Sequence, residues 1–312
     1  MFRAKSLPYI LLLGFLYGST LVASRFSVGQ YDPRTYISLR MILAATAHLS
    51  VYAGSGLVGA PRSIPRDGQL WRRAAILGVL GTAIPMTSIV SSLQYQSSGM
   101  TSLLLTLNPA ITVLLAQVFL PDEKLTARKI AGILIALGGA ALLLSRGENG
   151  LGALAETDWR GYAWVGIGVL GSASAGIYAR RTLRDENAWD VASIRMISAA
   201  LALLPVTYLA VGYDLSRVNT AGYSALIYAS LIGTFFGMWL SFYVIKRFGA
   251  TVASQTSYVI PVVSTILGAL VLEEVITPTM LVGMVIIFTG IALLNSRARA
   301  AAPAALHPQA GD

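Results

Sequence analysis

The sequence predicts an all-α polytopic membrane protein, with ten transmembrane helices arranged as two inverted five-helix repeats. Its composition, a series of ten apolar segments and an internal repeat support this fold class. Of the 312 residues, 55% are hydrophobic and only 12% are charged, and the mean hydropathy is +0.67. A soluble domain carries roughly 25% charged residues. The composition therefore argues against a soluble enzyme.

The apolar segments have the length that a membrane requires. A transmembrane helix needs about 20 mostly apolar residues to cross about 30 Å of hydrocarbon. Ten segments meet this description: residues 8–24, 34–54, 74–94, 98–119, 126–144, 159–179, 190–211, 221–245, 251–272 and 277–295. The first could be read as a secretory signal peptide, but the repeat includes it as a structural helix. We expect residues 299–312, rich in Ala and Pro, to form a disordered cytoplasmic tail.

The basic residues predict the orientation. Sixteen of the 23 Lys and Arg residues fall at the ends of segments on the side of the N-terminus, and five fall on the other side. Cytoplasmic connectors of membrane proteins carry this excess of Lys and Arg. We therefore expect both termini in the cytoplasm and the protein in a bacterial cytoplasmic (inner) membrane. On this interpretation the net charge of +9 reflects orientation and not nucleic-acid binding.

The chain also matches itself. Residues 37–51 (ISLRMILAATAHLSV) match residues 192–206 (ASIRMISAALALLPV) at an offset of 155, and Gly81-Thr82 matches Gly233-Thr234 at an offset of 152. A third match pairs Pro109, Glu123, Thr126 and Gly132 with Pro261, Glu274, Thr277 and Gly283, with one residue of slippage. The sequence thus predicts one repeat over residues 1–148 and another over residues 159–298.

Five helices are an odd number, so the second repeat enters the membrane from the opposite side. Inverted repeats recur in secondary transporters, whose substrate site lies near the midplane between the two repeats. A duplicated structural or receptor-like bundle that transports nothing is the alternative, but it leaves the inversion unexplained.

Two long motifs resemble a known family. They read PAITVLLAQVFLPDEKLTARKIAGILIALGG and PVVSTILGALVLEEVITPTMLVGMVIIFTG, and the first segment contains the related start GFLYGSTLVASR at residues 14–25. Together they resemble the EamA family of the drug/metabolite transporter superfamily, and within it bacterial amino-acid and metabolite exporters, including the aromatic amino-acid type. The resemblance implies a central cavity lined by the first, third, fourth, sixth, eighth and ninth segments. The second motif departs by having two glutamates, and the spacing to Thr277 favours Glu274 over Glu273 as the match to Glu123.

Polar and aromatic residues recur at helical spacing on these six segments. The predicted cavity residues are Tyr17, Thr20, Ser88, Tyr95, Thr101, Asn108, Ser174, Tyr178, Trp239, Tyr243, Ser254 and Tyr258. The alternative is that the hydroxyls only pack helices together and that the Tyr and Trp residues anchor helix ends at the membrane interface.

Two prolines and two arginines lie within predicted spans at repeat-equivalent positions. Pro109 and Pro261 remove a backbone hydrogen bond and kink their helices, as hinges or as static bends. Arg40 and Arg195 are the basic residues inside spans. We interpret them as structural, through snorkelling to the interface or through capping of backbone carbonyls.

The predicted span interiors contain no Asp, Glu or Lys. A phosphate would require several basic residues and a divalent metal would require carboxylates or imidazoles, so we expect no metal, no cofactor and no catalytic residues. His48 lacks a carboxylate partner in its span, which argues against a membrane enzyme. Hydroxyls, amides and aromatic faces suit a neutral or zwitterionic small molecule such as an amino acid. A cationic or amphipathic drug, held by cation–π contacts, is the alternative substrate. A monomer would suffice for either.

Topology gives a direct test, because the chain has no cysteine. Single cysteines introduced at Ser63 and Asn149 should react with a membrane-impermeant maleimide from opposite faces of the membrane. Labelling of both positions from one face would contradict the ten-span topology and the inversion with it.

Overall fold

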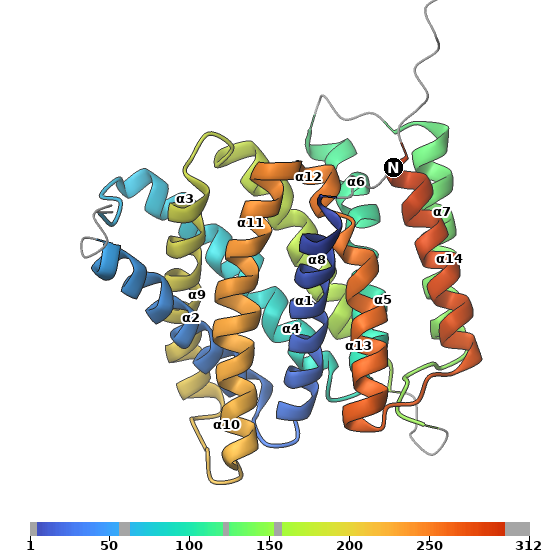
Figure 1. The fold of residues 1–312 in the computed structure, drawn as a ribbon, viewed down its shortest axis with the longest axis horizontal. Helices are drawn as coiled ribbons and strands as arrows, with labels where there is room; N and C mark the ends of the chain where they lie inside the picture. The colour runs from blue at the N-terminus through green and yellow to red at the C-terminus, as the bar shows by residue number, and fades with distance from the viewer. Residues whose placement is uncertain (1–4, 56–62, 121–124, 153–157, 297–312) are drawn as a thin grey trace, which may run out of the picture.

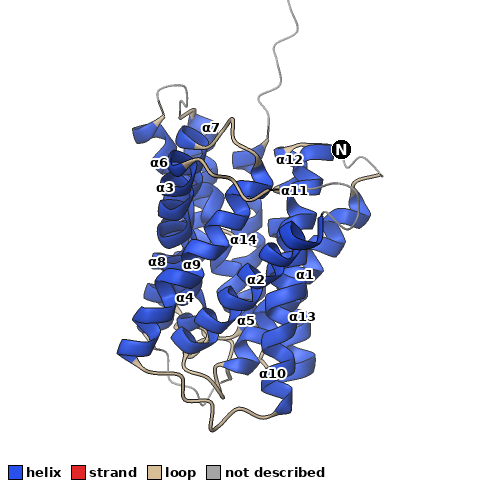
Figure 2. Cartoon of the chain, turned by 90° about the vertical axis from the view of Figure 1, so that its left-hand side faces the viewer, coloured by secondary structure: helices blue, strands red, loops and turns tan. Residues whose placement is uncertain are grey.

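The computed structural model describes residues 5–55, 63–120, 125–152 and 158–296, and every regular element in this part of the chain is helical. Figures 1 and 2 show one bundle whose helices run broadly along a common direction, with the connecting loops gathered at its two ends. The prediction of an all-α fold is therefore confirmed.

The elements of the first part are α1 (Leu7–Ser27), α2 (Pro33–Ser55), α3 (Gly68–Gly78), the π-helix η2 (Val79–Ala83), α4 (Ile84–Ser92), α5 (Ser98–Leu105), α6 (Asn108–Phe119) and α7 (Ala127–Ser145). Those of the second part are α8 (Trp159–Thr182), α9 (Ala188–Ala210), α10 (Thr220–Ile227), the π-helix η3 (Tyr228–Phe236), α11 (Gly237–Phe248), α12 (Ala250–Ala253), α13 (Thr256–Leu272) and α14 (Pro278–Asn295).

Nine helical segments within the described residues are long and apolar enough to cross a membrane. The predicted segment 251–272 folds as the short α12 followed by α13, which has 17 residues. At 1.5 Å per residue α13 is about 25 Å long, at the lower limit for a span. The count of ten spans therefore stays a prediction. The start of α1 and the end of α14 lie at the same end of the bundle (Figure 1), as an even number of crossings requires.

Helix starts follow local capping chemistry. Thr126 and Thr277, which the repeat pairs, both act as N-caps: their side chains accept hydrogen bonds from Lys129 N in α7 and Met280 N in α14. Asp67 caps α3 in the same way, accepting from Gln69 N at 2.8 Å. The third helical segment consequently begins at Gly68, six residues before the start that hydropathy alone predicts.

Helices α7 and α14 form a close pair at one edge of the bundle (Figure 1). A Cβ atom at Gly132 would lie 2.7 Å from the carbonyl oxygen of Gly290, so these backbones meet with no room for a side chain. Small residues permit this close approach between membrane helices. The pair corresponds to the fifth and tenth predicted segments.

Two sequence predictions need comment at this stage. The predicted tail, residues 299–312, and Glu123 of the first motif lie outside the described residues. Asn149 is only 6% exposed, so it is a poor labelling position. Ser145, which is exposed at the end of α7, is a better site for the topology test.

Candidate functional site

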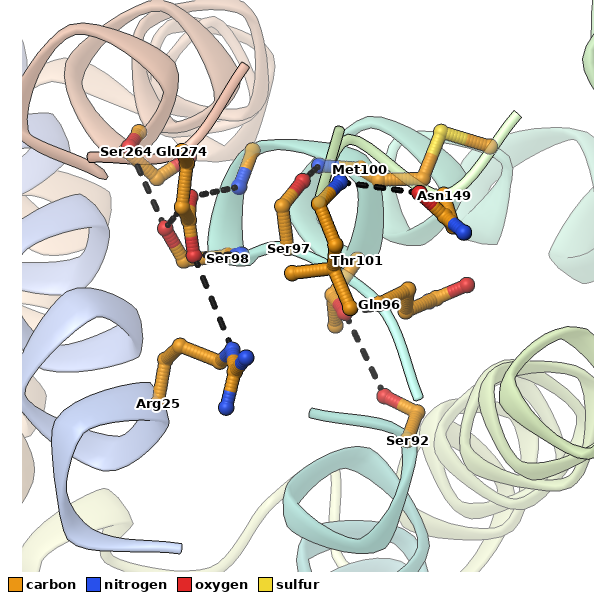
Figure 3. Close-up of polar contacts among 12 residues, drawn as sticks. Arg25, Ser92, Gln96, Ser97, Ser98, Met100, Thr101, Asn149, Ser264 and Glu274 are labelled. Atoms are coloured by element: carbon orange, nitrogen blue, oxygen red, sulfur yellow. Dashed lines mark hydrogen bonds and ion pairs between the residues drawn. The ribbon is translucent and has the colours of Figure 1, made fainter. Parts of the chain in front are cut away.

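One end of the bundle is closed around the start of α5. The carboxylate of Glu274, in the connector between α13 and α14, accepts hydrogen bonds from Ser98 N at 2.8 Å and from the Ser98 hydroxyl at 2.7 Å. A carboxylate is stabilised at a helix N-terminus, where backbone N–H groups and the helix dipole both face it. Figure 3 shows Glu274 reaching from its own segment to this helix start, with Arg25 on the other side.

Arg25 joins α1 to the same cluster. Its Nε lies 3.8 Å from Glu274 Oε1, and the side chain of Glu274 is only 5% exposed. Further contacts connect the α7–α8 and α13–α14 connectors: Val275 N donates to Gly150 O at 3.0 Å, and Ser97 N donates to Asn149 O at 2.8 Å. The ends of α1, α5, α7 and α13 are thus tied together. A pocket lined in part by Arg25, Gly29 and Glu274 lies beside these contacts.

Two arginines occupy equivalent places inside the bundle. Arg40 is the eighth residue of α2 and Arg195 is the eighth residue of α9, and both helices have 23 residues. Arg40 Nε donates to Thr234 Oγ1 at 2.8 Å and its Nη1 donates to Ser24 Oγ at 3.2 Å. Arg195 Nε donates to Thr82 Oγ1, and its Nη2 donates to the carbonyl oxygen of Gly81 at 2.6 Å.

Both threonines lie in π-helices, Thr82 in η2 and Thr234 in η3. A π-helical turn is a local bulge that occurs frequently at functional sites. The sequence interpretation that Arg195 caps a backbone carbonyl is correct, because it bonds Gly81. Snorkelling is not what the structure shows, since both guanidinium groups donate to neighbouring helices inside the bundle.

The arginines have no acidic counter-ion. Across the described ranges, neither guanidinium has an Asp or Glu oxygen within ion-pair distance. The predicted cavity residue Tyr17, at the middle of α1, lies close enough to interact electrostatically with both arginines. Tyr36, fully buried in α2, interacts with Arg40 as well. Two positive groups and two phenols therefore share the interior between α1, α2 and α9.

Several predicted cavity hydroxyls are buried in contacts of their own. Thr20 and Ser88 donate to backbone carbonyls four residues earlier, at 2.6 Å and 2.9 Å. Thr101 is fully buried at the closed end, where it accepts from Gln96 Nε2 at 3.0 Å. These three arrangements match the packing alternative. The Asn108 side chain accepts from Thr112 Oγ1 at 3.2 Å just after the break between α5 and α6.

Most of the remaining predicted cavity residues are more accessible. Trp239 stacks on Phe236 and Tyr243, with ring centroids at 5.4 Å and 6.2 Å, and these three rings form an exposed row along η3 and α11. Ser174 is exposed, whereas Tyr95, Tyr178 and Ser254 are half-buried. The guanidinium of Arg160 lies over the ring of Tyr95, 6.0 Å from the ring centroid.

Tyr258 lies in a different environment from that of the other rings. It packs edge-on against Phe288 of α14 at 5.4 Å, and its hydroxyl accepts from Asn295 Nδ2 at 3.4 Å. The structure thus brings Tyr17 and Thr20 together near η3 but directs Tyr258 toward the outer pair of helices.

His48 sits in a packed aromatic environment. Its ring lies 4.9 Å from that of Trp189 and 5.0 Å from that of Phe235, and Nδ1 is hydrogen-bonded to Ser193 Oγ at 3.0 Å. Within the part of the chain that the structure describes, no three His, Asp or Glu residues gather as metal ligands do.

Long apolar helices around a polar, charge-bearing interior define a multi-pass membrane protein. The sequence matches the EamA-like transporter family over residues 4–145 and 159–296. The chain therefore belongs to the EamA-like transporter family, in the drug/metabolite transporter superfamily.

Individual relatives agree with this assignment. The chain is 28% identical over 265 residues to a probable terminal-alkyne amino-acid exporter of Streptantibioticus cattleyicolor, covering 84% of each chain. It is 25% identical to the uncharacterized transporter YyaM of Bacillus subtilis, covering 83% of this chain and 84% of that one. It is 24% identical to the inner membrane transporter YedA of Escherichia coli, covering 82% and 79%. A solved crystal structure at 20% identity superposes with a TM-score of 0.63, covering 91% and 95%, and shows the same fold.

The two neighbouring acids at the end of α13 give a matched test of the closed end. Glu274→Gln removes a buried charge that caps α5 and faces Arg25, whereas Glu273→Gln changes an exposed side chain. Losing a hydrogen bond to a charged group costs about 1.5–3 kcal/mol. We expect Glu274→Gln to lower the unfolding temperature of the purified protein in detergent and Glu273→Gln to leave it unchanged. Equal unfolding temperatures for the two variants would show that the Glu274 contacts do not stabilise the closed end.

Proposed function

We propose that the protein is a secondary transporter that moves amino acids and related small neutral or zwitterionic metabolites across the bacterial cytoplasmic membrane by alternating access. It acts as an exporter or facilitator, with ten spans in two inverted repeats (residues 1–148 and 159–298) and both termini in the cytoplasm. The observation that carries the proposal is the membership of both halves of the chain in a transporter family.

The contacts of the two arginines support the two-repeat mechanism. Arg40 of the first half bonds Thr234 of the second, and Arg195 of the second half bonds Thr82 of the first. Each half therefore holds the other through the same pair of residue types. Two equivalent halves can exchange conformations, which converts an outward-open shape into an inward-open one.

The substrate class rests on the chemistry of the interior and on a relative. The S. cattleyicolor protein is named as a probable amino-acid exporter. The described span interiors here offer hydroxyls, aromatic rings and guanidinium groups but no acidic cluster. A zwitterionic molecule with an apolar part suits such groups, because it presents both a charge and a surface that rings can contact.

A second candidate substrate is a cationic or amphipathic drug, exported with or without proton coupling. The exposed row formed by Phe236, Trp239 and Tyr243 favours it, because stacked rings attract organic cations through their faces. The two uncompensated arginines oppose it.

Counterflow in proteoliposomes tests the proposed function directly. Vesicles preloaded with phenylalanine, leucine or propargylglycine, the last of which carries a terminal alkyne, should accumulate the same labelled compound transiently. We expect net flux to follow the substrate gradient and to ignore an imposed pH step, because His48 is packed among rings and the described span interiors contain no acidic side chain. Failure of every amino acid to exchange would refute the proposal. Sustained accumulation that a protonophore abolishes would refute the uncoupled mechanism alone.

The paired prolines would act as hinges in this mechanism. Residues 106–107 separate α5 from α6, and Pro109 lies in the first turn of α6. Residues 254–255 separate α12 from α13, and Pro261 lies inside α13. We expect Pro109→Ala and Pro261→Ala to slow exchange several-fold, with little change in substrate affinity, in single-turnover flux measurements. Pro205→Ala, inside α9 and exposed, is the matched control. Exchange at the wild-type rate in the double variant would make both prolines static bends.

A further inference from the structure

We propose that the guanidinium of Arg195 binds a carboxylate of the transported molecule. The inference deepens the proposed function, because it names the chemical group through which the substrate is held. It also excludes the cationic drug as the preferred substrate.

The first step is the depth of the charge. Arg195 is seven residues beyond the start of α9, which places it about 10 Å along the helix at 1.5 Å per residue. A positive charge within a membrane is costly, and such residues face the bundle interior or a water-filled cavity, where they pair with one another or with backbone carbonyls. The described residues supply no carboxylate to Arg195. Arg195 is bonded to neutral groups only, at Thr82 and Gly81, so a carboxylate of the substrate would be its first anionic partner among the groups described.

The second step is the geometry of the donors. A guanidinium has five N–H donors in a planar fork. Nε of Arg195 is used by Thr82 and one donor of Nη2 is used by the carbonyl of Gly81. These two contacts fix the orientation of the group. Nη1 makes no hydrogen bond to any residue that the structure describes, so Nη1 and the second N–H of Nη2 are available together. A pair of parallel N–H donors is the arrangement that binds a carboxylate in a bidentate manner.

The third step is access. Arg195 is partly exposed in the structure, whereas its repeat partner Arg40 is only 6% exposed and donates to both Thr234 and Ser24. The two equivalent arginines therefore differ in exposure: Arg195 keeps part of its surface accessible, whereas Arg40 is buried among its partners. Tyr17 interacts electrostatically with both arginines, and its hydroxyl is hydrogen-bonded to Ser241.

The fourth step is selectivity. A fixed positive charge in a region of low dielectric attracts an anionic group and repels a cation. An amino acid carries both charges, and its carboxylate can bind Arg195 while its ammonium group points away. An amine of the same shape but without the carboxylate has only the repelled charge.

The experiment uses three ligands with the same ring: L-phenylalanine, 3-phenylpropionate and 2-phenylethylamine. The purified full-length protein is titrated with each, and the rise of its unfolding temperature gives the apparent affinity. We expect both carboxylates to stabilise the wild type and the amine to leave it unchanged. Equal stabilisation by the amine, or none by either carboxylate, would overturn the inference.

Three variants locate the effect. Arg195→Gln should weaken the binding of both carboxylates at least about tenfold, as expected for the loss of a charge-assisted hydrogen bond. Arg195→Lys keeps the charge but loses the fork, so an intermediate affinity is expected. Arg217→Gln, which changes an exposed arginine between α9 and α10, should bind as the wild type does. If Arg195→Gln does not fold, the affinities of Arg195→Lys and of the wild type for the two carboxylates are compared instead. Equal affinities would overturn the inference.

Two results separate this inference from the proposed function. Phenylalanine exchange at the wild-type rate in Arg195→Gln vesicles would leave the transporter intact and remove the carboxylate site. Arg195-dependent binding of 3-phenylpropionate, together with no exchange of any amino acid by the wild type, would keep the site and refute amino-acid transport.

Discussion

The bilayer core contains no water to bond backbone groups that a helix leaves free, so each irregular turn in a membrane helix needs a partner from the protein. In this structure the π-helices η2 and η3 are such turns. Arg195 satisfies the Gly81 carbonyl in η2, and in η3 the Thr234 hydroxyl bonds the Ala229 carbonyl while accepting from Arg40. Each π-helix is thus held by an arginine from the other half of the chain. The irregular turns and the buried charges depend on these two contacts, which also join the two halves of the chain inside the bundle.

The closed end uses a different kind of interaction. There the strongest contacts join a carboxylate to a helix start and connector backbones to one another, as in the bonds from Ser98 to Glu274 and from Val275 to Gly150. In the proposed topology this end lies at the membrane surface, where water can replace these contacts when they break. The interior arginine contacts have no such replacement. A structure built in this way can open at its end while its middle stays joined.

The sequence predicts the framework well because the framework is periodic. Hydropathy locates the helices. The repeated Arg-Met and Gly-Thr pairs show that Arg40 is equivalent to Arg195 and that Thr82 is equivalent to Thr234. The repeat does not reveal that each arginine bonds the threonine of the other half, because this contact joins residues more than a hundred positions apart. Side-chain contacts were equally hidden: helical spacing predicts Tyr258 as a cavity residue but does not reveal that its ring packs on Phe288. The repeated motif singles out Glu274 as a residue of interest. It does not indicate that Ser98 is its hydrogen-bond partner, because the two residues meet only in the folded chain.

The two arginines also bear on the exclusion of protons and metal cations from the transport path. A bacterial membrane stores energy as an ion gradient, and any polar route across it is a potential leak. Fixed positive groups on a narrow path exclude protons and metal cations, as they do in water channels. Arg40 and Arg195 occupy the eighth position of helices of equal length, so in the proposed inverted topology each positive charge lies about 10 Å along its helix from one of the two faces of the membrane. The same residues that join the two halves would thereby prevent small cations from leaking across the membrane through the protein.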